Sequence, residues 1–116
     1  MINEYDNVYD NVYEEKVYKN NYENIYILKG SLTEEQAKKE IENIKKYFEN
    51  TEVYNKENDQ NGYLGKKRLA YNIGENEYGH YYLTYFRANA EEIQKIEKNL
   101  RFNDNVIKYI TIKIED

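Results

Sequence analysis

The sequence predicts an α+β domain in which two helices cover one face of a four-stranded antiparallel sheet. Two segments have the 3.6-residue apolar spacing of an amphipathic helix, and each begins with a capping pattern. Strand-like segments lie before, between and after them, in the order strand, helix, strand, strand, helix, strand. Several of these strands carry apolar or aromatic side chains in both alternating sets, so neither face of the sheet is expected to be polar.

The first strand is expected at Tyr22–Lys29. Ile25 and Ile27 belong to one alternating set and Tyr26 and Leu28 to the other. A helix follows, because Thr33 and Gln36 have the spacing of a capping box. Its apolar stripe is Ala37, Ile41, Ile44 and Phe48.

The middle of the sequence indicates two further strands joined by a turn. A second strand opens at Val53 and Tyr54, is interrupted by the polar run Lys56–Gly62, and resumes over Tyr63–Ile73. Gly74–Gly79 is expected to be a turn. The aromatic segment Tyr81–Arg87 is the expected third strand.

The second helix is expected to start near Asn89, with Glu92 in the capping-box position. After a turn at residues 103–105, the last strand covers Val106–Ile114. The helix stripe is Ile93, Ile96 and Leu100, and the last strand places Ile110, Ile112 and Ile114 on one face.

This order of elements is the ferredoxin-like, split βαβ arrangement. Two helices can cover only one face of its sheet. The opposite face still carries large apolar and aromatic groups, and an exposed patch of that kind usually marks a binding surface.

Composition narrows the class of protein. The chain has 116 residues, the size of one domain, with 40% apolar and 34% charged residues and a net charge of −5. Without cysteine it can form no disulfide, thiolate nucleophile or cysteine-ligated zinc site. No signal peptide or membrane-spanning run is evident, so a soluble cytoplasmic protein without a membrane association is expected.

Residues 1–21 differ from the remainder and are expected to form a flexible extension, with the domain spanning 22–116. A Tyr-Asp-Asn-Val unit occurs twice, and Tyr22-Glu23-Asn24-Ile25 is a third, related copy. The tyrosine spacing of about four suits one helical face, but asparagine, aspartate and valine are poor helix formers.

Lys66-Lys67-Arg68 is the one place where three cationic side chains are adjacent. On an acidic chain, such a cluster indicates a local contact with a negatively charged partner, although a charge run is also common on a solvated surface. Strand alternation predicts that Lys67 points away from Lys66 and Arg68. His80 has no second histidine or cysteine to share a metal with and is expected at the surface.

Several blocks of the chain resemble bacterial small-subunit ribosomal protein six, in order and in approximate spacing from residue 22 to the C-terminus. The most specific are Gly65-Lys66-Lys67-Arg68-Leu69-Ala70-Tyr71 and Leu100-Arg101-Phe102-Asn103-Asp104-Asn105-Val106. Two segments depart from the family pattern: residues 1–21 precede its usual start, and Asn55–Gly62 is longer than its usual connection.

The resemblance implies a non-enzymatic structural protein of the cytoplasmic ribosome. It implies pairing with small-subunit ribosomal protein eighteen and binding of the pair to the central domain of small-subunit ribosomal RNA. No cofactor, metal, catalytic residue or small-molecule substrate is expected. An acidic chain with one basic cluster fits a subunit whose partner supplies much of the phosphate neutralisation.

Two sets of site residues are expected. The RNA-binding candidates are Lys66, Lys67, Arg68, Arg101, Lys108 and Tyr22. Arg101 has an alternative role at the helix C-terminus, and Tyr22 has one as an ordinary strand-end aromatic. The partner-binding candidates are Tyr81, Leu83, Tyr85 and Tyr71, although a shift of one residue in register would exchange the two faces of a strand.

Two other function classes are compatible with such a fold. An acylphosphatase-like enzyme would need an arginine-bearing phosphate cradle after the first strand, but Lys29-Gly30-Ser31 stands there and Arg68 is the first arginine. A free-standing protein-interaction domain would use the apolar sheet face alone. Presence in purified small ribosomal subunits separates the ribosomal role from both.

Overall fold

The computed structural model describes residues 19–55 and 61–115 of the chain. The predicted 1–21 extension therefore lies outside the described residues up to position 18, as does most of the polar run after Asn55. The elements are β1 (Asn20–Lys29), α2 (Glu34–Ile44), the 3₁₀ helix η1 (Lys45–Phe48), β2 (Glu52–Val53), β3 (Gly62–Ile73), β4 (Asn76–Ala88), α3 (Ala90–Arg101) and β5 (Val106–Ile114).

All strand pairings in the sheet are antiparallel. β1 lies between β4 and β5, and the other edge of β4 pairs with β2 and, further along, with β3. The interrupted second strand of the prediction is thus two strands, which makes the sheet five-stranded. Otherwise the predicted order and the ferredoxin-like arrangement are confirmed.

Both helices begin where the capping patterns predicted. Thr33 Oγ1 accepts a hydrogen bond from the Gln36 amide at 3.1 Å, and the Gln36 side chain accepts one from the Thr33 amide at 2.8 Å. Asn89 and Glu92 form the same reciprocal pair at the start of α3. Because these bonds satisfy amides that have no partner within the helix, the two helix starts are defined by local sequence.

The hydrophobic core lies between the sheet and the two helices. Both helices pack on the same sheet face, because their buried residues join one cluster with a single alternating set from β1 and β4. The cluster contains Tyr26, Leu28, Ala37, Ile41, Ile44, Phe48, Phe86, Ala88, Ile96 and Leu100. The structure therefore assigns Tyr26 and Leu28 to the core, and Ile25 and Ile27 to the opposite face.

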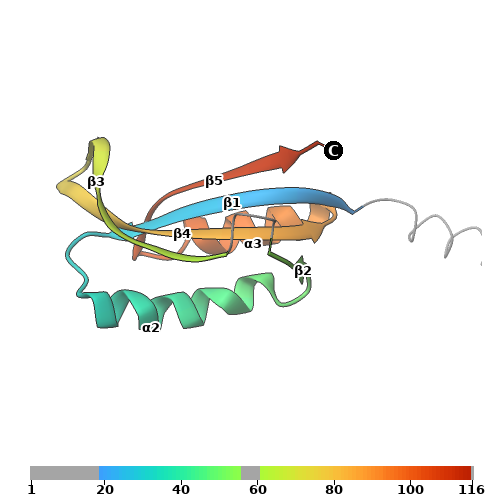
Figure 1. Ribbon diagram of the computed structural model, residues 1–116, viewed down its shortest axis with the longest axis horizontal. Helices are drawn as coiled ribbons and strands as arrows, with labels where there is room; N and C mark the ends of the chain where they lie inside the picture. Colours follow the sequence, from blue (N-terminus) through green and yellow to red (C-terminus); the bar gives the residue numbers. More distant parts are fainter. Residues whose placement is uncertain (1–18, 56–60, 116) are drawn as a thin grey trace, which may run out of the picture.

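The hairpin of β3 and β4 is longer than the sequence predicted. Only Gly74 and Glu75 form the turn between the two strands, and Gly74 has a φ of +59°. The prediction of a turn over Gly74–Gly79 was wrong, since Asn76–Gly79 already pair within the sheet. The hairpin tip projects at one end of the sheet, opposite to the end that carries β2 and the C-terminus of β5 (Figure 1).

An asparagine side chain bridges the gap between β2 and β3 along the edge of β4. Asn61 Oδ1 accepts a hydrogen bond from the Tyr85 amide, and Asn61 Nδ2 donates one to the Tyr54 carbonyl at 3.0 Å. The Asn61 amide donates to Asn55 Oδ1 at 3.3 Å. The side chain thus makes backbone hydrogen bonds that a continuous strand would otherwise make.

The turn after α3 is fixed by a carboxylate on α2. Glu40 Oε1 accepts hydrogen bonds from the side-chain amides of Asn103 at 3.2 Å and Asn105 at 3.0 Å, and Oε2 accepts one from Asn43 at 3.3 Å. Burial alone would raise the pKa of Glu40, but these three amide donors outweigh it and hold the pKa below its ordinary value. The network joins the helical layer to the start of β5.

Candidate interaction surfaces

The sheet face away from the helices, called the outer face here, contains three successive cross-strand rows, and Asn21, Arg87 and Ile114 form a fourth at one end. Each row has one residue from β4, one from β1 and one from β5. The three successive rows are Tyr85–Glu23–Ile112, Leu83–Ile25–Ile110 and Tyr81–Ile27–Lys108. Apart from Glu23 and Lys108, all of these side chains are apolar or aromatic, so the outer face has the composition of a core.

Part of the outer face is exposed and part is already covered. Ile110 is 46% exposed and Ile112 54% exposed, which is unusual for two neighbouring isoleucines. Ile27 is buried where the base of the hairpin crosses it, since a Cβ atom on Gly79 would overlap its Cγ2 atom. Tyr85 is buried beneath Tyr54, whose ring stacks on it with centroids 6.4 Å apart. The uncovered part lies over β5 and the adjoining side of β1.

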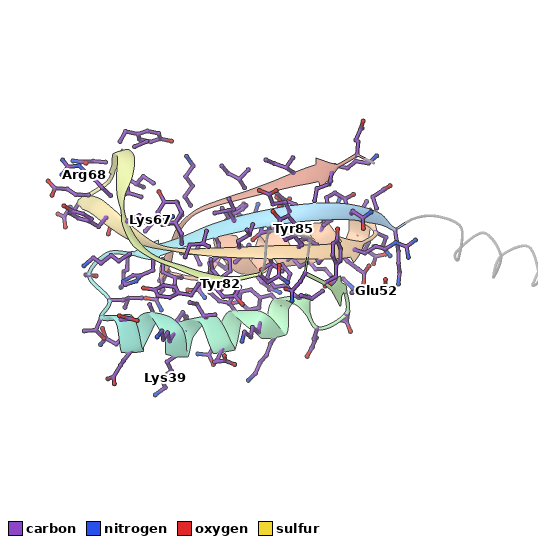
Figure 2. All side chains as sticks on the ribbon, viewed as in Figure 1. Lys39, Glu52, Lys67, Arg68, Tyr82 and Tyr85 are labelled. Carbon is purple, nitrogen blue, oxygen red and sulfur yellow. The ribbon has the colours of Figure 1, made fainter. Side chains whose placement is uncertain are left out.

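The three adjacent cations divide between the two sides of the hairpin. Lys66 Nζ and the Arg68 guanidinium lie 5.9 and 5.8 Å from the centroid of Tyr78. Lys67 Nζ lies instead 5.9 Å from the centroid of Tyr81, a ring of the outer face. The predicted alternation is therefore confirmed, and Lys67 and Arg68 are seen at the hairpin end of the molecule in Figure 2, with Glu52 at the other end. We call β3–β4 with these three cations the cationic hairpin.

The hairpin bends over the outer face. Lys108 Nζ on β5 donates a hydrogen bond to Tyr71 Oη on β3 at 2.8 Å and lies 4.9 Å from the ring centroid. In the sheet, β3 and β5 are separated by β4 and β1, which corresponds to about 14 Å at the usual strand spacing. The contact bounds a groove of about 200 Å³, which Ile25, Ile27, Tyr81, Lys108, Ile110, Ile112 and Glu23 line.

The remaining predicted residues lie apart from this group. Arg101 is at the C-terminal end of α3, where its guanidinium lies 5.4 Å from the centroid of Phe102, a ring that is 69% exposed. Tyr22 faces the helices and stacks on Phe86 with centroids 5.8 Å apart, far along β1 from the cationic hairpin. The structure thus brings together Lys67, Lys108, Tyr71 and Tyr81, but neither Arg101 nor Tyr22 joins them.

Lys29 and Tyr78 are not among the site residues that the sequence predicts, although both lie beside the cationic hairpin. Together with Lys66 they line a cleft of about 420 Å³ between the hairpin and the residues that follow β1. Glu75 and Glu77 also line this cleft, so its charge is mixed. Tyr78 is 40% exposed and is contacted by two cations, which the hairpin pairing of Arg68 with Tyr78 explains. The sequence does not reveal this pair, because the strand register shifts between Arg68 and Ile73 and counting residues back from the turn gives the wrong partner.

His80 is buried, with 1% of its surface exposed, so the prediction of a surface histidine was wrong. Its Nε2 donates a hydrogen bond to the Leu32 carbonyl at 2.8 Å. With that hydrogen fixed, Nδ1 in the neutral ring accepts from Tyr63 Oη, also at 2.8 Å. Both ring nitrogens join neighbouring elements, so His80 is a structural residue.

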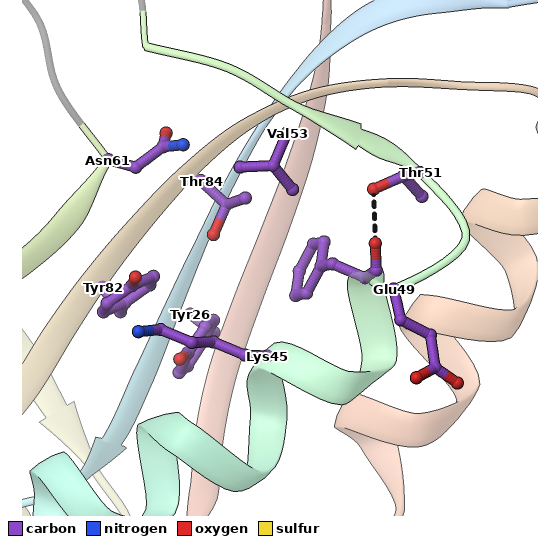
Figure 3. A pocket seen from close by; sticks show the side chains of 9 residues that line it. Tyr26, Lys45, Glu49, Thr51, Val53, Asn61, Tyr82 and Thr84 are labelled. Carbon is purple, nitrogen blue, oxygen red and sulfur yellow. Dashed lines mark hydrogen bonds between the residues drawn. The ribbon is translucent and has the colours of Figure 1, made fainter.

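A further pocket, of about 390 Å³, lies between α2–η1 and the gap that separates β2 from β3 (Figure 3). Phe48, Val53, Tyr26 and Tyr82 form most of its apolar lining. The Tyr26 hydroxyl has no hydrogen-bond partner among the described residues, and its burial raises its pKa well above the ordinary value. The described lining contains no histidine, no cysteine and no pair of carboxylates.

Within residues 19–55 and 61–115, no group of histidine, cysteine, aspartate or glutamate side chains is arranged to hold a metal ion. In the same part of the chain, no helix has the length and apolar content needed to span a membrane.

Comparison with known proteins agrees with this geometry. The family model for ribosomal protein S6 matches residues 21–113. The chain belongs to the ribosomal protein S6 family. Small ribosomal subunit protein bS6 of Sulfurovum sp. is 36% identical over 89 residues, covering 77% of this chain and 68% of the relative. The bS6 protein of Nitratiruptor sp. is 37% identical over 93 residues, covering 78% and 69%.

The fold agrees with that of a solved member. A crystal structure of 30S ribosomal protein S6 from Thermotoga maritima superposes with a TM-score of 0.72 at 24% sequence identity, covering 83% of this chain and 88% of that one. As an S6-family member, the chain is a structural component of the small ribosomal subunit, located on the cytoplasmic ribosome, and it is not an enzyme. The resemblance in the sequence is therefore confirmed.

Proposed function

We propose that this chain binds small-subunit ribosomal protein eighteen through its outer face, and that the pair binds the central domain of small-subunit ribosomal RNA. The observation that carries the proposal is the pair of half-exposed isoleucines on β5, Ile110 and Ile112, beside the cationic hairpin. Ile110 and Ile112 are as apolar as core residues, but no part of the described chain covers them. Because apolar surface of this kind is stabilised by burial, a protein partner is the occupant that fits it.

The RNA contact is assigned to the cationic hairpin. The whole chain carries a charge of −5, so attraction to phosphate must come from a local group of cations. Lys66 and Arg68 lie on one side of the hairpin and Lys67 on the other. We infer that Lys66 and Arg68 meet phosphates, while Lys67 lies where RNA and partner protein adjoin. Arg101 and Tyr22, which lie elsewhere, stay predictions as RNA contacts.

The test of the RNA contact is a filter-binding titration of ribosomal RNA with the chain and protein eighteen. Changing Lys66, Lys67 and Arg68 together to glutamine should weaken binding, and the salt dependence should become shallower by about two to three in logarithmic slope. The matched control changes Lys38, Lys39 and Lys46 to glutamine, which removes the same charge from the helical layer, where Lys39 projects from α2 in Figure 2. Equal effects of both triple variants would show a general charge effect and would reject the direct contact.

The test of the protein contact is size-exclusion chromatography of the chain mixed with protein eighteen. A heterodimer is expected with the wild-type chain. Changing Ile110 to aspartate should abolish it, because an uncompensated carboxylate would then lie in the apolar interface. A heterodimer that forms equally well with Ile110→Asp would show that the outer face is not the interface.

A further inference from the structure

Glu23 is the one acidic side chain in the three rows of the outer face. It lies on β1, the central strand, between Tyr85 on one side and Ile112 on the other. The adjacent row, Leu83–Ile25–Ile110, is wholly apolar. A half-buried carboxylate in such a position lies directly under any protein that covers the exposed isoleucines.

Within the described chain this carboxylate forms no ion pair, and the cation of the adjoining row already has a partner. Arg87 is the next outward-facing residue of β4 after Tyr85, and its guanidinium lies 3.7 Å from a carboxylate oxygen of Glu52. Glu52 also lies 3.4 Å from Lys19 Nζ, so both cations at that corner already have a carboxylate partner. Glu23 is left without a cation of its own.

Covering an unpaired carboxylate with an apolar partner is costly, because the charge loses its water and gains nothing in return. A partner that brings a cation to the same place removes that cost, and it also fixes its register on an otherwise featureless apolar surface. The opposite end of the face carries Lys67 and Lys108, about 13 Å away along four residues of β1. On this face, Glu23 therefore lies on one side of the wholly apolar row, and Lys67 and Lys108 lie on the other.

We propose that Glu23 is the residue that selects and orients the protein bound to the outer face, by pairing with an arginine or lysine of that protein. This inference rests on the proposed function, since it assumes that protein eighteen sits on the outer face. The expected partner segment places apolar side chains over Ile110 and Ile112 and a cationic side chain over Glu23. The part of this partner segment that lies near Lys108 and the cationic hairpin is expected to carry no cation or to be negatively charged.

The test is a calorimetric titration of protein eighteen into the full chain and its variants. Glu23→Gln should weaken binding by roughly 10-fold to 100-fold and Glu23→Lys by more, since a lost or reversed charge leaves the partner's cation buried and unpaired. Glu49→Gln removes the same charge from an exposed position at the end of η1 and should bind as the wild type does. Thermal unfolding of the free Glu23→Gln chain should be unchanged, which separates loss of a partner contact from loss of fold.

A charge exchange identifies the opposite residue. Each arginine or lysine of protein eighteen is changed singly to glutamate and titrated against Glu23→Lys, and one of these changes should restore binding. If Glu23→Gln binds as the wild type does while Ile110→Asp does not bind, the pairing is wrong but the outer face remains the interface. If Ile110→Asp also binds as the wild type does, or the wild-type chain itself does not bind, the proposed function fails and this inference fails with it.

Discussion

The two faces of this sheet are made of similar residues but differ in their exposure to solvent. On the helix-facing side, Tyr26 is 1% exposed and Leu28 0% exposed. On the outer face, Ile110 is 46% and Ile112 54% exposed, although isoleucine is at least as apolar as tyrosine. Full burial of such a side chain is worth about 1.5–3 kcal/mol, so each half-exposed isoleucine leaves roughly 1 kcal/mol to be gained from a covering protein.

The two faces also treat their carboxylates differently. On the helical side, Glu40 accepts hydrogen bonds from Asn103, Asn105 and Asn43. On the outer face, Glu23 has no such donors and no ion pair among the described residues. Within the described residues, the carboxylate on the helical side therefore has its hydrogen-bond donors in place, whereas the one on the outer face is open to a group from outside them.

The largest effect on stability should come from the covered side. Leu100→Ala should lower the free energy of unfolding by about 2–5 kcal/mol, because Leu100 is fully buried in the core between helix and sheet. Urea unfolding followed by circular dichroism measures it. A loss below about 1 kcal/mol would show that the helical layer is not a packed core.

A smaller loss is expected at the base of the hairpin, where the outer face is also close-packed. Gly79→Ala should cost about 1–3 kcal/mol, because the new methyl group would overlap Ile27 Cγ2 and lie close to Leu69. Urea unfolding followed by circular dichroism measures this loss as well. An unchanged midpoint would show that the hairpin does not rest on Ile27 and that this end of the outer face is as open as the β5 end.

The two carboxylates should respond differently to neutralisation. Glu40→Gln should cost about 1 kcal/mol at pH 7, whereas Glu23→Gln should change stability by less than about 0.5 kcal/mol. Since folding depresses the pKa of Glu40, its contribution is present above the ordinary carboxyl pKa and is lost as the pH falls through the folded value. The difference between wild type and Glu40→Gln should therefore shrink on acidification, and a constant difference from pH 7 to pH 3 would contradict the network.

The smallest change in stability is expected at the half-exposed isoleucines of β5. Ile112→Ala should cost less than about 1 kcal/mol in the isolated chain, because half of the side chain already contacts water. Added protein eighteen should enlarge that difference, since the truncated side chain would then be missing from an interface. A variant that loses as much stability alone as Leu100→Ala would show that β5 is part of the core.

The sequence predicts features that depend on neighbouring residues better than features that depend on register. Thr33 with Gln36 and Asn89 with Glu92 predict the helix starts correctly, because capping is a contact across three residues. The faces of β1 are not predictable in this way, since Ile25, Ile27, Tyr26 and Leu28 are apolar in both alternating sets. Only the pairing with β4 and the position of the helices decide which set is buried.

The same limit applies to the interaction surfaces. Alternation correctly separates Lys67 from Lys66 and Arg68. The contact of Tyr71 with Lys108 depends on the bend of the hairpin across the sheet, and the burial of His80 depends on Tyr63 and the Leu32 carbonyl. Those contacts join residues that are 37, 17 and 48 positions apart, so no local pattern could indicate them.

The measurement that most directly tests the difference between the two faces is the affinity of protein eighteen for the double variant Ile110→Asp, Ile112→Asp, determined by calorimetry alongside its thermal midpoint. Two carboxylates at the half-exposed isoleucines of β5 should leave the fold intact, because both side chains are about half in water, but should reduce the affinity at least 100-fold by placing charges in an apolar interface. Wild-type affinity with an unchanged midpoint would contradict the account, since the outer face would then be open for some reason other than binding that partner.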